Sequence, residues 1–124
     1  MKIQESAENY LETILILSER IGNVRSIDIV NELSFTKPSV SVAMKNLREN
    51  GYIRMDQDGY ITLTEAGREI ADMIYERHRL LSGWLMQLGV SEKTATEDAC
   101  RMEHGISQKS FERIRDAYSA TQKQ

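Results

Sequence analysis

The sequence contains a single cysteine and a single proline among 124 residues. One cysteine excludes an internal disulfide framework, so we expect a cytoplasmic protein whose thiol is reduced or bound to a metal. One proline and only 7 glycines leave few helix breakers, which favours long helices over many short strands. The first residues lack the apolar core of a signal peptide, and no apolar run approaches the roughly 18 residues of a membrane span. We therefore expect no membrane partner.

An excess of positive charge is also missing, because the formal net charge is -3. This balance argues against non-specific binding to polyanions, but it does not exclude local DNA contact, which depends on where the basic groups lie. The 40% hydrophobic and 28% charged content is ordinary for a globular protein. The length suits one domain or two small lobes that share a core.

The first half of the chain has the pattern of a helix-turn-helix. Apolar residues at helical spacing predict helices over 5–20, 26–33 and 38–50. We expect Ser26 to cap the second helix, and Thr36 with Pro38 to start the third. Two short helices joined by a tight turn are typical of a DNA-binding helix-turn-helix.

A predicted hairpin follows directly, with strands over 52–55 and 60–63 around an Asp-Gly turn. A hairpin in this place is typical of the wing of a winged helix, although the acidic turn would oppose close approach to phosphates. The alternative is an ordinary solvated helix face. Candidate DNA contacts are the exposed polar and basic positions of this half, namely Arg25, Ser26, Thr36, Lys37, Pro38, Ser39, Ser41, Lys45, Arg48 and Arg54.

The second half is predicted to be entirely helical, beginning with a long helix over 64–88. At about 1.5 Å per residue this helix is too long for so small a lobe, so we expect it to link two domains, 1–63 and 64–124. The expected fold is therefore mainly α with a small β-wing: a winged helix-turn-helix followed by a helical domain. Apolar stripes in the second domain predict a homodimer, and a two-fold dimer suits a palindromic operator in double-stranded DNA.

The stretch Cys100-Arg-Met-Glu103-His104 carries the candidate chemistry. Positions i, i+3 and i+4 of a helix lie on one face, so a thiol, a carboxylate and an imidazole converge there as half of a divalent-metal site. The alternative is a partly buried cysteine beside a surface Glu-His pair. We do not expect an enzyme or a small-molecule substrate, because no Gly-rich oxyanion loop or third orienting residue accompanies Cys100 and His104.

The order winged helix, long linking helix and Ala99-Cys-Arg-Met-Glu-His104 resembles the diphtheria-toxin-repressor family of metal-dependent transcriptional regulators, in its short two-domain form. Further matching stretches are Glu8-Asn-Tyr-Leu-Glu-Thr-Ile14, Pro38-Ser-Val-Ser41, Thr64-Glu-Ala-Gly67 and Tyr75-Glu-Arg-His-Arg-Leu-Leu81. The resemblance implies a repressor that binds promoter DNA as a dimer when loaded with metal. The metal ligands that it implies are Asn9, Glu12, His78, Cys100, Glu103 and His104.

This ligand set combines two branches of the family. Glu12 and His78 match the manganese-responsive branch, Cys100 matches the iron-responsive branch, and Asn9 matches neither and offers only an uncharged oxygen. A thiolate favours Fe(II), Co(II), Ni(II) or Zn(II) over Mn(II), whereas several oxygen ligands favour Fe(II) or Mn(II) over tetrahedral zinc. We expect Fe(II) ahead of Mn(II), with Zn(II), Co(II) or Ni(II) able to bind in vitro. The alternative function is a winged-helix regulator whose second domain only dimerises, or senses a non-metal ligand or redox state through Cys100.

Overall fold

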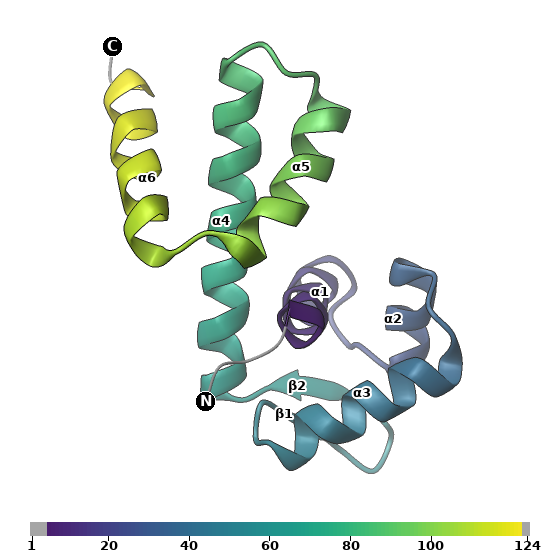
Figure 1. Ribbon diagram of the computed structural model, residues 1–124. Helices are drawn as coiled ribbons and strands as arrows, with labels where there is room; N and C mark the ends of the chain where they lie inside the picture. The colour runs from purple at the N-terminus through teal and green to yellow at the C-terminus, as the bar shows by residue number, and fades with distance from the viewer. Residues whose placement is uncertain (1–4, 123–124) are drawn as a thin grey trace. The chain divides into compact units, whose positions relative to one another are not determined.

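The computed structural model describes residues 5–122, which form, in chain order, α1 (Glu5–Ile21), α2 (Ser26–Leu33), α3 (Lys37–Glu49), β1 (Ile53–Met55), β2 (Ile61–Leu63), α4 (Glu65–Gln87), α5 (Glu92–Gly105) and α6 (Gln108–Gln122) (Figure 1). The chain divides into an N-terminal unit, Met1–Met73, and a C-terminal unit, Ile74–Gln124, so the division falls within α4. The ends of the two expected domains, residues 1–4 and 123–124, lie outside the described residues. The mainly helical fold with a small β-wing is confirmed.

Helices α2 and α3 form the expected helix-turn-helix. The hydroxyl of Thr36 accepts a hydrogen bond from the backbone N–H of Ser39 (3.3 Å), and Pro38 lies in the first turn of α3. The expectation that Ser26 caps α2 is wrong, because Ser26 is already the first helical residue. The carboxylate of Asp28 instead accepts a hydrogen bond from the backbone N–H of Arg25 (2.9 Å), which satisfies the helix start from inside the first turn.

The hairpin that follows is antiparallel, with Ile53 opposite Leu63 and Met55 opposite Ile61. Its turn is built by Asp56, whose carboxylate accepts hydrogen bonds from the backbone N–H groups of Asp58 within the turn and of Tyr60 after it, each at 2.9 Å. The backbone N–H of Ile61 also bonds to the carbonyl of Val24 at 2.8 Å, which fastens the wing to the segment before α2.

Buried apolar side chains from α1, α2, α3, both strands and the start of α4 form the core of the N-terminal unit. Its buried members include Leu11, Ile14, Leu15, Leu17, Val24, Ile29, Val40, Met44, Ile53, Ile61 and Ala71. The helical spacing of these residues in α1 and α3 is the pattern that predicted the helices. One side of α3 is therefore held in the core, and its other side faces outward.

Helix α4 opens with a cap in which the hydroxyl of Thr64 accepts from the backbone N–H of Gly67 (3.2 Å) and donates to the carbonyl of Gly51 (2.6 Å). Its C-terminal half packs with α5 and α6 to form the C-terminal unit, where Figure 1 shows α5 and α6 on opposite sides of α4. The buried residues of this unit include Ile74, Leu81, Ala95, Ala99 and Phe111.

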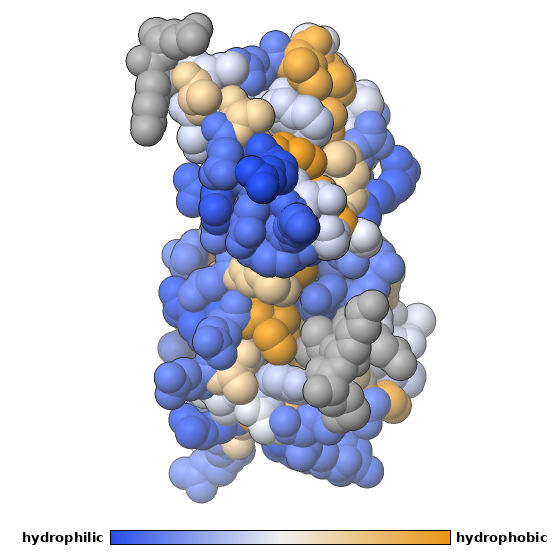
Figure 2. All heavy atoms as spheres, turned by 60° about the vertical axis from the view of Figure 1, so that its left-hand side comes forward, coloured by the Kyte–Doolittle hydropathy of each residue, from blue (hydrophilic) through white to orange (hydrophobic). Residues whose placement is uncertain are grey.

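The face drawn in Figure 2 is covered mostly by hydrophilic residues, with smaller hydrophobic areas between them. Large apolar side chains that remain exposed among the described residues are Ile21, Ile27, Phe35, Val42, Met86 and Leu88. None of the helices within residues 5–122 combines the length and the apolar character that a membrane crossing requires.

Candidate functional site

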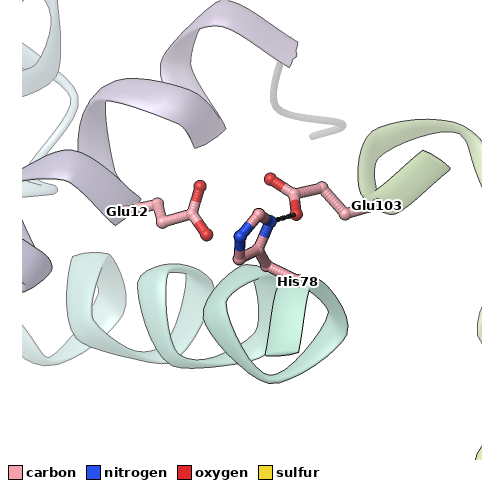
Figure 3. A group of neighbouring side chains, drawn as sticks. All are labelled: Glu12, His78 and Glu103. Carbon is pink, nitrogen blue, oxygen red and sulfur yellow. Dashed lines mark hydrogen bonds and ion pairs between the residues drawn. The ribbon is translucent and has the colours of Figure 1, made fainter. Parts of the chain in front are cut away.

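The side chains of His78 and Glu103 meet inside the C-terminal unit. His78 projects from α4 and Glu103 from α5, and the imidazole Nδ1 lies 3.0 Å from the carboxylate Oε2, as the dashed line in Figure 3 shows. The Glu103 side chain is fully buried, whereas His78 keeps 23% of its side-chain surface exposed. A buried carboxylate is costly unless it is paired, so this contact fixes both side chains.

A second imidazole lies on the other side of the same carboxylate. His104 Nε2 is 3.5 Å from Glu103 Oε1, and its side chain is 4% exposed. Glu103 Oε1 itself is buried and makes no hydrogen bond to any residue within the described range. One carboxylate between two imidazoles, with a buried oxygen still to be satisfied, is the donor chemistry of a divalent transition-metal site. The residues present therefore fit a bound cation.

Arg77, the neighbour of His78, holds the end of α5 in place. Its guanidinium donates to the main-chain carbonyls of Glu103 (3.0 Å) and Ile106 (2.8 Å) and to the side-chain oxygen of Gln108 (2.9 Å). The same group lies over the ring of Phe111, 5.4 Å from its centroid. The carbonyls at a helix end lack intrahelical partners and carry partial negative charge, so a buried cation there is doubly favourable.

Sequence reasoning missed Arg77. The available signal was an arginine next to a candidate ligand on a long amphipathic helix. Its hydrogen-bond partners lie 26 to 31 residues away along the chain, so local spacing does not reveal them.

The structure brings together three of the six predicted metal ligands in the C-terminal unit: His78, Glu103 and His104. Cys100 lies on α5 one turn before Glu103, and its side chain is exposed. The remaining two, Asn9 and Glu12, belong to α1 of the N-terminal unit, where Asn9 is partly exposed and Glu12 is buried. Figure 3 also draws the side chain of Glu12.

The predicted DNA contacts are mostly exposed, and most of them lie on or beside α3. Thr36, Lys37, Pro38, Ser39, Ser41, Lys45 and Arg48 are all exposed there, as is Arg54 on β1. Arg25 is exposed and its guanidinium lies 4.4 Å from the ring centroid of Tyr60, so the start of α2 and the wing meet through a cation–π contact. Ser26 is half-buried.

Comparison with known proteins matches both halves of the chain. Residues 2–61 match the family described as "Iron dependent repressor, N-terminal DNA binding domain". Residues 64–123 match the family described as "Iron dependent repressor, metal binding and dimerisation domain". The candidate ligands His78, Glu103 and His104 thus fall in the half that matches a metal-binding domain.

Individual proteins that are similar to this chain over most of its length are also transcriptional regulators. The chain is 34% identical over 115 residues to an HTH-type transcriptional regulator of Methanocaldococcus jannaschii, covering 91% of this chain and 92% of the relative. It is 33% identical over 109 residues to the transcriptional regulator MntR of Salmonella typhimurium, covering 88% of this chain and 69% of the relative.

Two solved structures have the same fold. The manganese regulator SloR superposes with a TM-score of 0.81 at 29% identity, and a manganese-dependent transcriptional repressor in complex with manganese with a TM-score of 0.83 at 27% identity. They cover 96% and 91% of this chain, which spans 55% and 52% of theirs. These relatives are transcriptional regulators that join a DNA-binding domain to a metal-binding and dimerisation domain. The chain belongs to the diphtheria-toxin-repressor family of iron-dependent repressors.

Proposed function

We propose that this protein represses transcription in the cytoplasm by binding operator DNA as a homodimer when it is loaded with Fe(II) or Mn(II). The observation that carries the proposal is the buried Glu103 carboxylate between His78 and His104, in the half of the chain that matches a metal-binding domain. The winged helix of the other half supplies the DNA-binding surface.

The proposed ligands come from both units. His78, Glu103 and His104 form the part in the C-terminal unit, and Glu12 of α1 is the proposed ligand from the N-terminal unit. Glu12 is supported by its match to the family pattern and by its buried position on α1. Asn9, three residues earlier on α1, is the proposed neutral oxygen donor.

A divalent cation, when bound, would supply positive charge beside the buried Glu103 carboxylate. Ligands drawn from the two units would then favour one arrangement of the DNA-binding unit relative to the dimerising unit. The gain in DNA affinity equals the preference of the ion for that arrangement and cannot exceed it. Coupling of this kind is usually worth about 5- to 150-fold in affinity.

Cys100 is the proposed basis for a preference for Fe(II) over Mn(II). The nitrogen and oxygen ligands suit both ions, and a thiolate would add softness that Mn(II) does not favour. Cys100 lies on α5 one turn before Glu103 and His104, on the same face of the helix, so its thiolate would bind the same ion. Cys100→Ser should therefore narrow the difference in affinity between Fe(II) and Mn(II), and leave metal binding itself in place.

The test is the affinity for a duplex that the protein selects from a random pool in the presence of Mn(II). Fluorescence anisotropy with Mn(II), with anaerobic Fe(II) and with chelator should show tighter binding with either metal. Glu103→Gln, which keeps the shape and removes the charge, should abolish the difference. Glu97→Gln on the exposed side of α5 is the matched control and should behave like the wild type. Equal affinity in wild-type protein with and without metal would reject the proposal, and absence of any bound metal would favour a regulator that senses something else.

A further inference from the structure

Val42 is an exposed apolar residue in the middle of α3. It is the sixth residue of the helix and 60% of its surface is exposed, the second largest value among the exposed large apolar residues. The buried side of α3 is formed by Val40, Met44 and Leu47, each at most 4% exposed. At 3.6 residues per turn, Val42 points about 140° to 160° away from each of these three. Its side chain therefore contributes nothing to the core.

The local helix does not explain a valine at this position either. A β-branched residue loses side-chain rotamer freedom in a helix, so valine is a poorer helix former than alanine, lysine or glutamine. The neighbouring positions on the outward side, Ser41, Lys45 and Asn46, are all polar and exposed. An apolar side chain centred among them adds nothing to the stability of the isolated unit, and it would gain free energy only where a partner covers it.

The surroundings of Val42 favour DNA as that partner. Lys37, Lys45 and Arg48 lie on the same helix and are exposed, with no acidic residue before Glu49 at the helix end. In a helix-turn-helix the N-terminal part of the second helix faces base edges in the major groove, and cations beside it bind phosphates. A valine cannot hydrogen-bond to a base, and the apolar group in the major groove is the C5-methyl of thymine.

We propose that Val42 is a specificity-determining residue that contacts the C5-methyl group of a thymine in each half of the operator. This inference rests on the proposed function, because it requires the metal-loaded protein to bind DNA through α3. Val42 sets which base is accepted, whereas the exposed cations of α3 set how tightly any duplex is held.

The experiment removes one methyl group at a time from the DNA. Wild-type protein with Mn(II) is first used to select duplexes from a random pool. Each dT of the selected duplex is then replaced in turn by dU, which differs only by the missing C5-methyl, and the affinity is measured by anisotropy. The same scan is run with Val42→Ala and with Ile27→Ala, which shortens another exposed branched side chain, on α2.

We expect one position in each half-site at which dU weakens wild-type binding by about three- to fivefold, the value of burying a methyl-sized group. Val42→Ala should bind the dT and dU duplexes equally at that position, and Ile27→Ala should retain the wild-type loss. Val42→Ala should also leave the unfolding midpoint unchanged or slightly raised, because the residue is exposed and alanine is the better helix former.

Three outcomes overturn the inference. A scan with no methyl-sensitive position, or a loss that persists unchanged in Val42→Ala, shows that Val42 reads no methyl group. A lower mass of Val42→Ala in light scattering shows that the partner of Val42 is a second copy of the chain. Failure to select any duplex with metal present is a different result, because it removes the proposed function and this inference with it.

Discussion

The guanidinium of Arg77 donates a hydrogen bond to the main-chain carbonyl of Glu103, 3.0 Å away, while the adjacent His78 meets the carboxylate of the same residue at 3.0 Å. Two consecutive residues of α4 thus hold the backbone and the side chain of one residue of α5. This double contact sets the distance between the two helices at the candidate metal centre. Both contacts are made by residues of the chain itself, without a bound ion.

Arg77→Met should therefore destabilise the metal-free protein and weaken metal binding. The change leaves the buried carbonyl of Glu103 and the part-buried carbonyl of Ile106 without the Arg77 donor, and a buried group left unsatisfied costs about 1–3 kcal/mol. We expect the free energy of unfolding in urea to fall by about 3 kcal/mol, and calorimetry to show weaker Mn(II) binding. Arg79 is exposed two residues further along α4, so Arg79→Met is the control. It should change the free energy of unfolding and the Mn(II) affinity by little. An unfolding curve for Arg77→Met that matches the control would contradict this role.

Metal should stabilise the folded protein through Glu103. A ligand that binds only the folded state adds about 2.7 kcal/mol at a free concentration one hundred times its dissociation constant. The thermal midpoint of wild-type protein should therefore rise as Mn(II) is added and return when chelator removes it. Glu103→Gln should show no such rise, because the buried negative charge that the ion satisfies is gone.

The matched control for this titration is Glu97→Gln, at an exposed position of the same helix. Its midpoint should rise with Mn(II) as the wild type does. The expectation fails if Glu103→Gln is stabilised to the same extent as the control, since the ion would then be bound elsewhere.

Much of the fold followed from local chemistry in the sequence. The cap at Thr36, the proline that follows it and the spacing of Val40, Met44 and Leu47 each act within one or two helical turns, so a single sequence displays them. The cap expected at Ser26 was wrong for a local reason as well. Asp28 reaches back from the first turn and satisfies the same backbone group, and composition alone does not decide between these two residues.

The candidate site was less predictable. The spacing of residues along a helix gives the direction in which each side chain points, but not which side chains the rest of the chain buries. Cys100, Glu103 and His104 share one face of α5, yet the side chain of Cys100 is exposed, whereas those of Glu103 and His104 are buried. Which of these side chains is covered depends on α4, whose residues lie some 25 positions earlier in the chain. The supporting role of Arg77 depends on the same long-range packing.

Gly67 should tolerate no side chain, because α4 starts against the backbone of Tyr52. A Cβ at position 67 would collide with the carbonyl oxygen of Tyr52, and a backbone atom cannot move aside as a flexible side chain can. Gly67→Ala should lower the free energy of unfolding by about 1–3 kcal/mol, as overpacking usually does. Gly105→Ala is the control, because an added Cβ there meets nothing within 4 Å. Equal urea midpoints for the two variants would show that the start of α4 can shift without cost.

The effect of Gly83→Ala on the free energy of unfolding should change sign when the hydroxyl of Tyr118 is removed. An added Cβ at position 83 of α4 would lie 2.8 Å from the hydroxyl oxygen of Tyr118 on α6, but no closer than 3.4 Å to the ring carbons. Alanine is a better helix former than glycine by up to about 1 kcal/mol, so this gain competes with the collision.

In the wild-type background we expect Gly83→Ala to be destabilising. In the Tyr118→Phe background the hydroxyl is absent, and the same change should become stabilising. The double-mutant cycle, measured by urea unfolding, should give a coupling of about 1 kcal/mol between the two positions. A coupling near zero would mean that α6 moves away from α4 to admit the methyl group, and that the close approach of these helices at Gly83 is not required.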